Sequence, residues 1–252
     1  MLGQGRHSVN KADVLLQVQG LNAWYGSAHI LFNLGLQVGR GEVVALMGRN
    51  GAGKSTTLKS IMGLLSRKQG QVMFMGQDIS RSQPYQIARL GLGYVPEDRR
   101  VFSDLTVTEN LETGRQAERF WPDGSPVPSW TPQDLYALFP NLGAMQNRLG
   151  GQMSGGEQQM LSVARTLMGN PSVVLLDEPS EGVAPIIVEQ MGHMILALKQ
   201  QGVSILLSEQ NIHFAAWVSD RAYVLEKGQI RYSGSMDDLL ANQEIRRDYL
   251  AL

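Results

Sequence analysis

Residues 48–56 read GRNGAGKST, a glycine-rich loop with the spacing G-x-x-x-x-G-K-[ST]. An apolar run that is typical of a buried strand precedes the loop, and the helix-forming sequence KSTTLKSIMGLL overlaps its end. This order of strand, loop and helix is the context that a phosphate-binding loop requires. Backbone N–H groups in such a loop, together with the positive end of the helix, bind phosphate oxygens. The sequence therefore predicts a nucleotide-phosphate site at residues 48–56.

The loop also suggests parts for individual side chains. Lys54 is expected to reach the β- and γ-phosphate oxygens, Ser55 to ligate Mg²⁺ and Thr56 to contact the α-phosphate. The alternative is a glycine-rich turn that binds nothing, and the strand, the Lys-Ser pair and the helix in this order argue against it. The predicted phosphate site comprises Gly48, Arg49, Asn50, Gly51, Ala52, Gly53, Lys54, Ser55 and Thr56.

A second motif, VVLLDE at residues 173–178, is an apolar strand that ends in two acids, Asp177 and Glu178. Carboxylates at this end of a parallel strand lie in the crevice where nucleotides bind. Asp177 is predicted to hold Mg²⁺ through water, and Glu178 to polarise the water that attacks the γ-phosphate. The alternative is that the two acids only cap the strand and meet solvent. The phosphate loop earlier in the chain argues against it.

Strand and helix patterns alternate along the chain. VLLQVQGLNAWYG and ILFNLGLQVGRGEVVALMG predict three strands with a turn at residues 39–41, QVMFMGQDI predicts one strand, and GLGYVP predicts a short one. From Glu97 to Asn170, helical stretches such as VTENLETGRQAERF replace the strands. VVLLDE and VSILLS are buried strands on either side of the helix PIIVEQMGHMILALKQ, RAYVLEKGQIRYSG predicts a hairpin, and Ser235 caps a last helix. We therefore expect an α/β fold with a mostly parallel sheet that is covered on both faces.

The length and composition set the expected domain organisation. A chain of 252 residues with 43% apolar content buries a sizeable core, as one domain with an inserted lobe or as two small domains. We expect a loose polar extension at residues 1–12 and a single domain at 13–252. Within it we expect a sheet core at about 13–95 and 171–235, a helical insert at about 97–170 and C-terminal helices at about 235–252.

The composition also excludes classes of function. The chain has 22 Lys and Arg residues against 23 Asp and Glu residues, so it lacks the basic excess that is typical of nucleic-acid-binding proteins. It has no cysteine, which excludes disulfides, thiolate metal sites and thiol nucleophiles. It shows neither a signal-peptide core nor an apolar run of about 18 residues, the length that spans a bilayer. We expect a protein on the cytosolic side that binds no nucleic acid and does not insert into a membrane.

A third motif, MSGGEQQM at residues 153–160, places Ser154, Gly155 and Gly156 at the start of a helix. Backbone donors and the helix dipole make such a start an anion site that needs no catalytic group. Taken alone, the stretch equally fits an ordinary capped helix. Its position between the phosphate loop and VVLLDE is more specific, because this order of motifs resembles the ATP-binding-cassette (ABC) ATPases from about Val14 to the end of the chain.

The resemblance implies an ABC-type P-loop ATPase with a mostly parallel, RecA-like sheet core, an N-terminal antiparallel β subdomain and an inserted α-helical subdomain. ATP and Mg²⁺ are the implied cofactors. In this family the Ser-Gly-Gly signature binds the γ-phosphate of the ATP that the other subunit of a head-to-tail dimer holds. Ser154, Gly155 and Gly156 are therefore expected to act on a partner's ATP, with two ATP molecules sandwiched between two subunits that separate after hydrolysis.

Tyr25 matches the aromatic residue that stacks on adenine in this family, a role that suits a planar ring because it binds a base by its face. A core tyrosine on an early strand is one alternative. The neighbouring Trp24 is a competing candidate for the stacking residue.

The sequence departs from the family pattern at three positions. Glu97 stands where a glutamine usually contacts Mg²⁺ and water, and Gln210 stands where a histidine usually bonds to the γ-phosphate. We still expect both in the catalytic set with Lys54 and Glu178, and Glu97 as a further Mg²⁺ ligand. Ala184 replaces an aspartate that commonly contacts the opposite subunit. These departures suggest a heteromeric arrangement with two unequal sites.

Three longer stretches indicate which branch of this family the chain resembles. YVPEDRRVFSDLTVTENL, MSGGEQQMLSVARTLMGNP and LLSEQNIHFA resemble the second ATP-binding subunit of importers for branched-chain amino acids and related polar or amide solutes. Glu181 in EGVAP, often a leucine in such subunits, is similar to the urea- or amide-importing branch. The resemblance implies a second ABC ATPase subunit, two membrane-spanning permease subunits and a peripheral place on the cytoplasmic face of the inner membrane. The permeases are expected to bind in a groove near residues 97–102.

Other interpretations remain open at this point. Soluble relatives in translation or DNA repair usually carry two cassettes or a long coiled-coil insert, and this chain has neither. Glu178 argues against a non-hydrolysing regulatory binder, whereas Glu97 and Gln210 do not. Export cannot be told from import by the motor alone. The stretch FWPDGSPVPSWTP is expected to be a rigid surface loop with two rings tucked against the helical lobe, and a partner-binding loop is the alternative.

Overall fold

The computed structural model describes residues 14–121 and 123–250. Its centre is a six-stranded sheet in the order β10-β9-β3-β8-β7-β6, whose neighbouring strands are parallel except for β10 with β9. The strands are β3 (Val43–Met47), β6 (Leu92–Val95), β7 (Val173–Asp177), β8 (Ser204–Glu209), β9 (Arg221–Glu226) and β10 (Gln229–Ser235). Every residue of β3 and β7 is buried, which explains why both sequences are nearly continuous apolar runs.

A second, antiparallel sheet has the order β2-β1-β4-β5 and comprises β1 (Val14–Tyr25), β2 (Ala28–Gly39), β4 (Lys68–Phe74) and β5 (Gln77–Asp78). The prediction of one strand for QVMFMGQDI is wrong. Met75 and Gly76 have φ angles of 49° and 79°, and they form a two-residue turn that pairs β4 with β5. Positive φ at both central residues is typical of a turn that reverses the chain between two strands.

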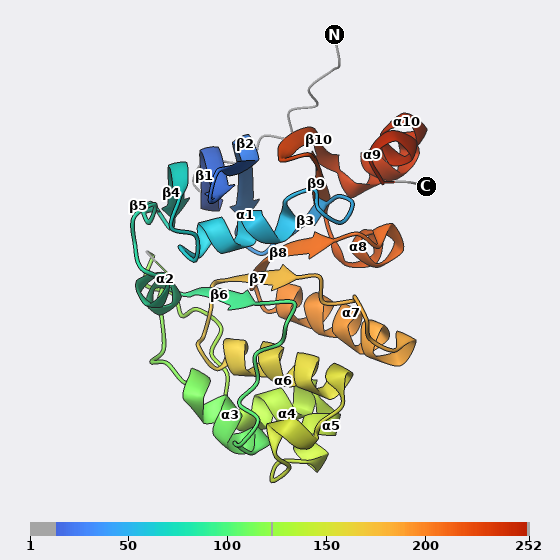
Figure 1. Ribbon diagram of the computed structural model, residues 1–252. Helices are drawn as coiled ribbons and strands as arrows, with labels where there is room; N and C mark the ends of the chain where they lie inside the picture. Colours follow the sequence, from blue (N-terminus) through green and yellow to red (C-terminus); the bar gives the residue numbers. More distant parts are fainter. Residues whose placement is uncertain (1–13, 122, 251–252) are drawn as a thin grey trace.

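Side chains of the central sheet alternate between two cores. Val173 and Leu175 of β7 pack on the side of the antiparallel sheet, whereas Val174 and Leu176 pack on the opposite side. This alternation follows from the two-residue repeat of a strand. Figure 1 shows the resulting layers. The antiparallel sheet and α1 (Lys54–Ile61) cover one face of the central sheet, and α6 (Gly155–Leu167) and α7 (Pro185–Gln200) cover the other.

The segment between β6 and β7 contains most of the helices that form a lobe beneath the central sheet (Figure 1). VTENLETGRQAERF was expected to be helical, but its helix ends at Gly114, so the prediction is wrong beyond that residue. A Cβ on Gly114 would lie 2.1 Å from the carbonyl oxygen of Arg165, so this close contact with α6 requires glycine, a poor helix former. The lobe comprises α3 (Val107–Gly114), α4 (Pro132–Leu138), α5 (Pro140–Ala144), the 3₁₀ helix η2 (Gly150–Gln152) and α6.

Short helices complete the fold. Helix α2 (Pro84–Leu90) was not predicted, although Gln83 and Gln86 form a capping box around Pro84 at its start. The hydroxyl of Ser235 accepts a hydrogen bond from the Asp238 N–H at 3.0 Å, which confirms the predicted cap. The remaining helical elements are α8 (Ile212–Val218), α9 (Met236–Ala241), α10 (Gln243–Ile245) and the π-helical turn η3 (Arg246–Leu250). Over residues 14–121 and 123–250, no helix combines the length and the apolarity needed to cross a bilayer.

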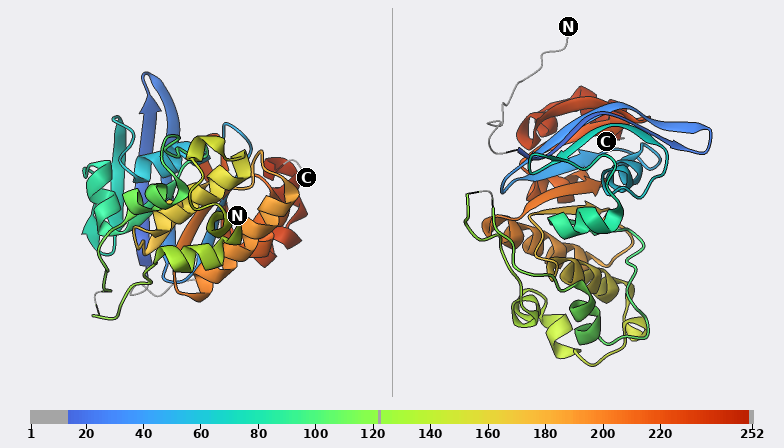
Figure 2. Two further views of the ribbon diagram at one scale, coloured as in Figure 1. Left: turned by 90° about the horizontal axis from the view of Figure 1, so that it is seen from below. Right: turned by 90° about the vertical axis from the view of Figure 1, so that its left-hand side faces the viewer.

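Residues 115–121 and 123–131 belong to a strap that leaves the helical lobe, reaches the level of the central sheet and returns (Figure 2). The Trp121 ring is 4% exposed and packs in the core on the antiparallel-sheet side. The Arg40 guanidinium, in the turn between β2 and β3, lies 4.2 Å from the centre of this ring and 3.4 Å from the Asp123 carboxylate. Trp130 packs in the lobe-side core. Both rings are buried as expected, but only Trp130 lies against the helical lobe, so the prediction is wrong for Trp121.

Candidate active site

The phosphate loop connects the end of β3 to the start of α1, as its sequence predicts. Gly53, directly before the first helical residue, has a φ of 111°, which glycine adopts without strain. A Cβ on Gly48 would lie 2.4 Å from the carbonyl oxygen of Leu225, so the loop also needs glycine for close packing against β9. These constraints hold the loop at the N-terminus of α1, where unpaired N–H groups and the helix dipole favour an anion.

Lys54 lies inside the loop and pairs with Glu178. Its Nζ donates to the carbonyl oxygens of Gly48 at 2.7 Å and Arg49 at 3.2 Å, and it lies 3.1 Å from Glu178 Oε1. The two side chains are 3% and 8% exposed, so little water competes for this ion pair. The structure thus brings together the predicted phosphate-binding lysine and the predicted water-polarising carboxylate.

Asp177 accepts hydrogen bonds from three hydroxyl groups. Its Oδ1 receives them from Ser55 at 3.0 Å and Ser208 at 2.9 Å, and its Oδ2 receives one from Tyr94 at 3.1 Å. Burial raises the pKa of Asp177, and the three hydrogen bonds oppose that shift. Burial, followed by the charge of Asp177, likewise raises the pKa of Tyr94. Ser208 and Tyr94 were missed in the sequence because they reach Asp177 only through the neighbouring strands β8 and β6.

Ser55 and Asp177 fit Mg²⁺ with phosphate and water ligands. Both offer hard oxygen atoms, and these atoms lie 3.0 Å apart at the mouth of the loop. Mg²⁺ is commonly held by one or two carboxylates plus substrate phosphates and waters, rather than by a cage of protein side chains. In keeping with this, the part of the chain that the structure describes contains no group of three or more His, Cys, Asp or Glu residues suited to a metal.

Glutamates gather around the end of β7. Glu178 has a φ of 48°, an uncommon conformation for a residue other than glycine, and one that concentrates at functional sites. The Glu181 N–H donates to the Glu178 carbonyl oxygen at 3.2 Å, and hydrogen bonding with the Glu178 side chain, followed by burial and the charges of Glu178 and Glu97, raises the pKa of Glu181 to about 7. Glu97 is exposed on the loop after β6. The expected Mg²⁺ contact of Glu97 stays a prediction.

Gln210 and the neighbouring Glu209 follow β8. Gln210 is exposed, and its expected contact with the γ-phosphate stays a prediction. Glu209 is buried and accepts N–H groups from Ser180 at 3.2 Å, Gln210 at 3.1 Å and Asn211 at 3.2 Å. Burial raises the pKa of this carboxyl. Glu209 therefore ties the loop after β7 to the loop after β8, a role that sequence reasoning missed because its backbone partners carry no sequence signal.

Tyr25 and Trp24 differ in how far they are free to bind a base. Trp24 stacks on His29 with ring centres 4.3 Å apart, and the Arg67 guanidinium lies 5.1 Å from its ring. Tyr25 ends β1 and is 48% exposed, so the alternative of a core tyrosine is wrong. An exposed ring at a strand end suits base stacking better than the Trp24 ring, which already stacks on His29 and lies close to Arg67.

The Ser-Gly-Gly motif lies apart from the phosphate loop of the same chain. Ser154 caps α6, accepting the Glu157 N–H at 3.4 Å while Glu157 accepts the Ser154 N–H at 2.7 Å. A Cβ on Gly155 would lie 2.6 Å from the Arg99 guanidinium, and one on Gly156 would lie 2.7 Å from Ile187. Helices α6 and α1 pack on opposite faces of the central sheet. The motif therefore does not join the group formed by Lys54, Asp177 and Glu178.

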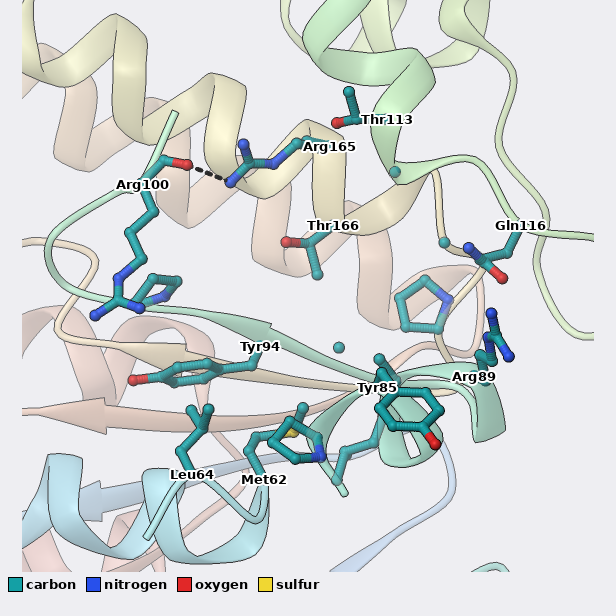
Figure 3. A pocket seen from close by; sticks show the side chains of 18 of the residues that line it. Met62, Leu64, Tyr85, Arg89, Tyr94, Arg100, Thr113, Gln116, Arg165 and Thr166 are labelled. Atoms are coloured by element: carbon teal, nitrogen blue, oxygen red, sulfur yellow. Dashed lines mark hydrogen bonds between the residues drawn. The ribbon is translucent and has the colours of Figure 1, made fainter. Parts of the chain in front are cut away.

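A groove of about 580 Å³ lies between α2 and β6 on one side and α3 and α6 on the other (Figure 3). Apolar side chains such as Leu64, Tyr85 and Phe102 are exposed along it. Arg165 crosses it, donating to the Arg100 carbonyl oxygen at 2.8 Å with its guanidinium 5.0 Å from the Phe102 ring. This groove lies where the sequence predicts the permease contact.

Comparison with known proteins agrees with this geometry. The family model described as ABC transporter matches residues 31–181. The high-affinity branched-chain amino acid transport ATP-binding protein BraG of Pseudomonas aeruginosa is 40% identical over 94% of this chain and 99% of its own length. A probable branched-chain amino acid transport ATP-binding protein, LivF of Archaeoglobus fulgidus, is 37% identical over 92% of this chain and 97% of its own length.

More distant relatives include ATP-binding proteins of other transport systems. The lipopolysaccharide export system ATP-binding protein LptB of Haemophilus influenzae is 33% identical over 94% of this chain and 97% of its own length. The crystal structure of a nucleotide-free ATP-binding cassette from an ABC transporter superposes with a TM-score of 0.77 at 26% identity, over 92% of this chain and 97% of the other. The predicted fold class is thereby confirmed. The chain belongs to the family of ABC transporter ATP-binding proteins, which are ATPases coupled to transport.

Proposed function

We propose that this chain is the ATP-hydrolysing subunit of a membrane importer for branched-chain amino acids. The observation that carries the proposal is the assembly of Lys54, Ser55, Asp177 and Glu178 at the phosphate loop. The relatives at 40% and 37% identity, both branched-chain amino acid transport ATP-binding proteins, support the solute class.

The site suggests a division of labour among its side chains. Lys54 binds the β- and γ-phosphates, and Ser55 and Asp177 hold Mg²⁺, directly and through water respectively. Mg²⁺, when bound, neutralises charge on the phosphates. Glu178 polarises the attacking water, and Tyr25 stacks on adenine. Glu97 and Gln210, which follow β6 and β8, complete the set proposed for catalysis.

The position of Ser154, Gly155 and Gly156 supports a second ATPase subunit. Because α6 lies across the central sheet from the phosphate loop, the motif is suited to the ATP of another chain rather than its own. The departures at Glu97, Gln210 and Ala184 favour a heterodimer with unequal sites, and a homodimer is the alternative for the isolated chain.

ATP-binding subunits of ABC transporters work with membrane permease subunits. We place two permeases at the groove lined by Tyr85 and Phe102, one on each ATPase subunit. Exposed apolar residues there are suited to a docked helix. The chain would then act on the cytoplasmic face of the inner membrane, bound through the permeases, with residues 13–252 working as one ATPase domain.

Glu181 favours a second candidate solute, urea or another small amide, because this position resembles that branch of the family. Uptake of labelled leucine and of labelled urea, each measured in cells with and without the gene, separates the two candidates. Loss of leucine uptake alone supports the amino acid importer, and loss of urea uptake alone supports the alternative.

The proposal is tested with the tagged variant Glu178→Gln, which should bind MgATP but stall hydrolysis and so hold the nucleotide-bound complex together. Native membranes are solubilised with ATP, and the proteins that co-purify are identified by mass spectrometry. A second cassette ATPase and two multi-span membrane proteins are expected. Glu244→Gln, an exposed site in α10, is the matched control that should hydrolyse ATP normally. Recovery of ribosomes, repair proteins or only the chain itself would contradict the importer.

A further inference from the structure

The groove between α2 and α6 has one wall that few side chains hold in place. In α2, Ile87 is the only buried residue, whereas seven residues of α6 are buried. Helix α2 is also seven residues long, and a helix of that length is not stable by itself. The position of α2, and with it the width of the groove, therefore depends on contacts at the ends of the helix.

Arg119, in the strap, contacts both walls at one end of the groove. Its guanidinium donates to the carbonyl oxygens of Ala88, at 3.3 Å, and Arg89, both in the last turn of α2. Its Nε donates to the carbonyl oxygen of Gly169, just after α6, at 3.3 Å. Ala88, Arg89 and Gly169 all line the groove, and Figure 3 shows the Arg89 and Gln116 side chains at this end of it. One planar side chain thus joins the two walls.

Arginine is chemically suited to this contact. Carbonyl oxygens in the last turn of a helix lack partners within the helix and lie at the negative end of its dipole, so they attract a cation. Hydrogen bonds from a charged donor are about twice as strong as those between neutral groups. The guanidinium holds its five N–H groups in one plane, so it can bond to two elements at once, whereas a lysine ammonium group cannot reproduce this geometry.

The strap holds Arg119 in place. The Arg119 carbonyl oxygen accepts the Val127 N–H at 2.9 Å across the strap, and Trp121, two residues further on, is buried in the core. A Cβ on Gly91 would lie 3.2 Å from Arg119 Cδ, so the glycine after α2 leaves room for the arginine stem. Arg119 thus connects an anchored strap to the weakly packed helix α2.

We propose that Arg119 is a positioning residue for permease binding: it holds α2 at a fixed distance from the end of α6 and so sets the width of the groove before a permease binds. A groove that is already ordered lowers the conformational cost of binding and strengthens it. This inference rests on the proposed binding of permeases in this groove. Arg119 is not among the described residues that line the groove, so it acts through the walls.

The first test measures amide hydrogen exchange in the full-length chain. Arg119→Met keeps the stem without a donor, and Arg119→Lys keeps the charge without the planar fork. We expect Arg119→Met to speed exchange in residues 84–91 by about tenfold or more, and Arg119→Lys to speed it less. Exchange in β3 and β7 should stay as in wild type, because the effect is local. Unchanged exchange in residues 84–91 of Arg119→Met would overturn the proposal.

Arg115→Met is the matched control for the first test. Arg115 lies in the same strap and is exposed, and its guanidinium pairs with Glu112 of α3 rather than with α2. The same substitution there should leave exchange in residues 84–91 at the wild-type rate. Equal acceleration by Arg115→Met and Arg119→Met would show that the strap as a whole, and not the Arg119 contact, holds α2.

The second test measures permease binding. Tagged Glu178→Gln, alone or combined with Arg119→Met or Arg115→Met, is purified from native membranes solubilised with ATP. The two membrane-spanning proteins recovered per ATPase chain should fall at least about threefold with Arg119→Met and stay unchanged with Arg115→Met. Equal recovery with all three chains, despite faster exchange in Arg119→Met, would overturn the role in binding. If Glu178→Gln alone recovers no permease, the importer itself fails, whereas exchange still decides whether Arg119 holds α2.

Discussion

Asp177 is held by hydroxyl groups from three elements, α1, β6 and β8. Burial nevertheless raises its pKa, so the folded chain binds this proton more tightly than the unfolded chain does. A carboxyl group whose pKa is raised by folding lowers the free energy of unfolding as the pH rises above the ordinary pKa of that group. The ionised Asp177 is therefore kept at a cost to stability, which is common for residues that serve function.

We expect Asp177→Asn to unfold at a higher urea concentration than wild type at about pH 8, with the difference shrinking as pH falls toward about 4. The same variant should bind Mg²⁺ in the presence of ATP about 10-fold to 100-fold more weakly. Urea unfolding at several pH values and Mg²⁺ titration of ATP hydrolysis measure the two effects. Asp104→Asn, at an exposed position, is the control. A variant that is less stable than wild type at alkaline pH would show that the hydrogen bonds outweigh the burial of charge.

The site residues that could be predicted from sequence are those whose sequence neighbours form a recognisable motif. The phosphate loop is continuous in the chain, and Asp177 and Glu178 directly follow an apolar strand, so spacing alone identified them. Ser208 and Tyr94 reach Asp177 from other strands, and their positions depend on strand order and register. No local pattern encodes that register, and both residues were therefore missed.

At the scale of elements, helices α7 and α8 pack closely because residue 192 of α7 is a glycine, which has no side chain. A Cβ on Gly192 of α7 would lie 2.0 Å from a ring carbon of Trp217 on α8, with two more ring carbons within 2.5 Å. Trp217 also contacts the His193 and Phe214 rings with centres 5.2 Å and 6.3 Å apart. The ring is thus held over Gly192, and the two helices approach each other at this point.

We expect Gly192→Ala to lower the free energy of unfolding by about 1–3 kcal/mol, because the added methyl group overpacks this contact. The double variant Gly192→Ala with Trp217→Ala should recover part of that loss, since alanine is otherwise the better helix residue. Urea unfolding of both single variants and of the double variant gives the coupling energy. Additive effects would mean that Trp217 moves aside without cost.

Helices and strands were predicted correctly where the sequence has a continuous apolar run. They were missed where a short polar sequence determines the local structure. The strands of the central sheet follow from apolar runs such as VVALM and VVLLD. Helix α2 was missed because only its Ile87 is buried, which leaves little hydrophobic period to detect. The turn at Met75 and Gly76 was missed because methionine is an unusual residue at positive φ.

At the scale of the whole molecule, the strap joins the helical lobe to the far end of the central sheet. Asn170 fixes its two ends in the lobe, accepting from the Trp130 N–H at 3.0 Å and donating to the Gln116 carbonyl oxygen at 3.1 Å. Trp121 and Arg40 fix its tip at the turn before β3. The phosphate loop follows the opposite end of β3. The strap is therefore anchored at the end of the sheet remote from the nucleotide site.

We expect Trp121→Ala to lower the free energy of unfolding by about 3–5 kcal/mol and to speed amide hydrogen exchange in residues 115–131. Arg40→Ala should cost only about 0.5–1 kcal/mol, because it removes the cation but leaves the ring buried. Urea unfolding and hydrogen exchange read by mass spectrometry measure both variants. Phe120→Ala, at an exposed neighbour, is the control. Equal effects of Trp121→Ala and Phe120→Ala would show that the strap tip is not anchored.

The layered arrangement as a whole followed from alternating strand and helix patterns, but the path of the strap did not. FWPDGSPVPSWTP lacks a period that would show where each tryptophan packs. Trp121 finds its place because the sheet-side core offers an apolar site beside Arg40, which is about 80 residues away in sequence. Contacts at such separations follow from the assembled fold, not from local sequence.

The stacking of Arg40 on Trp121 has an optical consequence. Indole emission shifts with the electric field across the ring, and a guanidinium 4.2 Å from its centre sets much of that field. The chain contains only four tryptophans, and phenylalanine at Trp24, Trp130 and Trp217 would leave Trp121 as the sole tryptophan. Its spectrum would then report whether the Arg40 guanidinium lies against the Trp121 ring, without an attached dye. The contact that holds the tip of the strap at the sheet is thus also a fluorescent probe of whether the strap is attached.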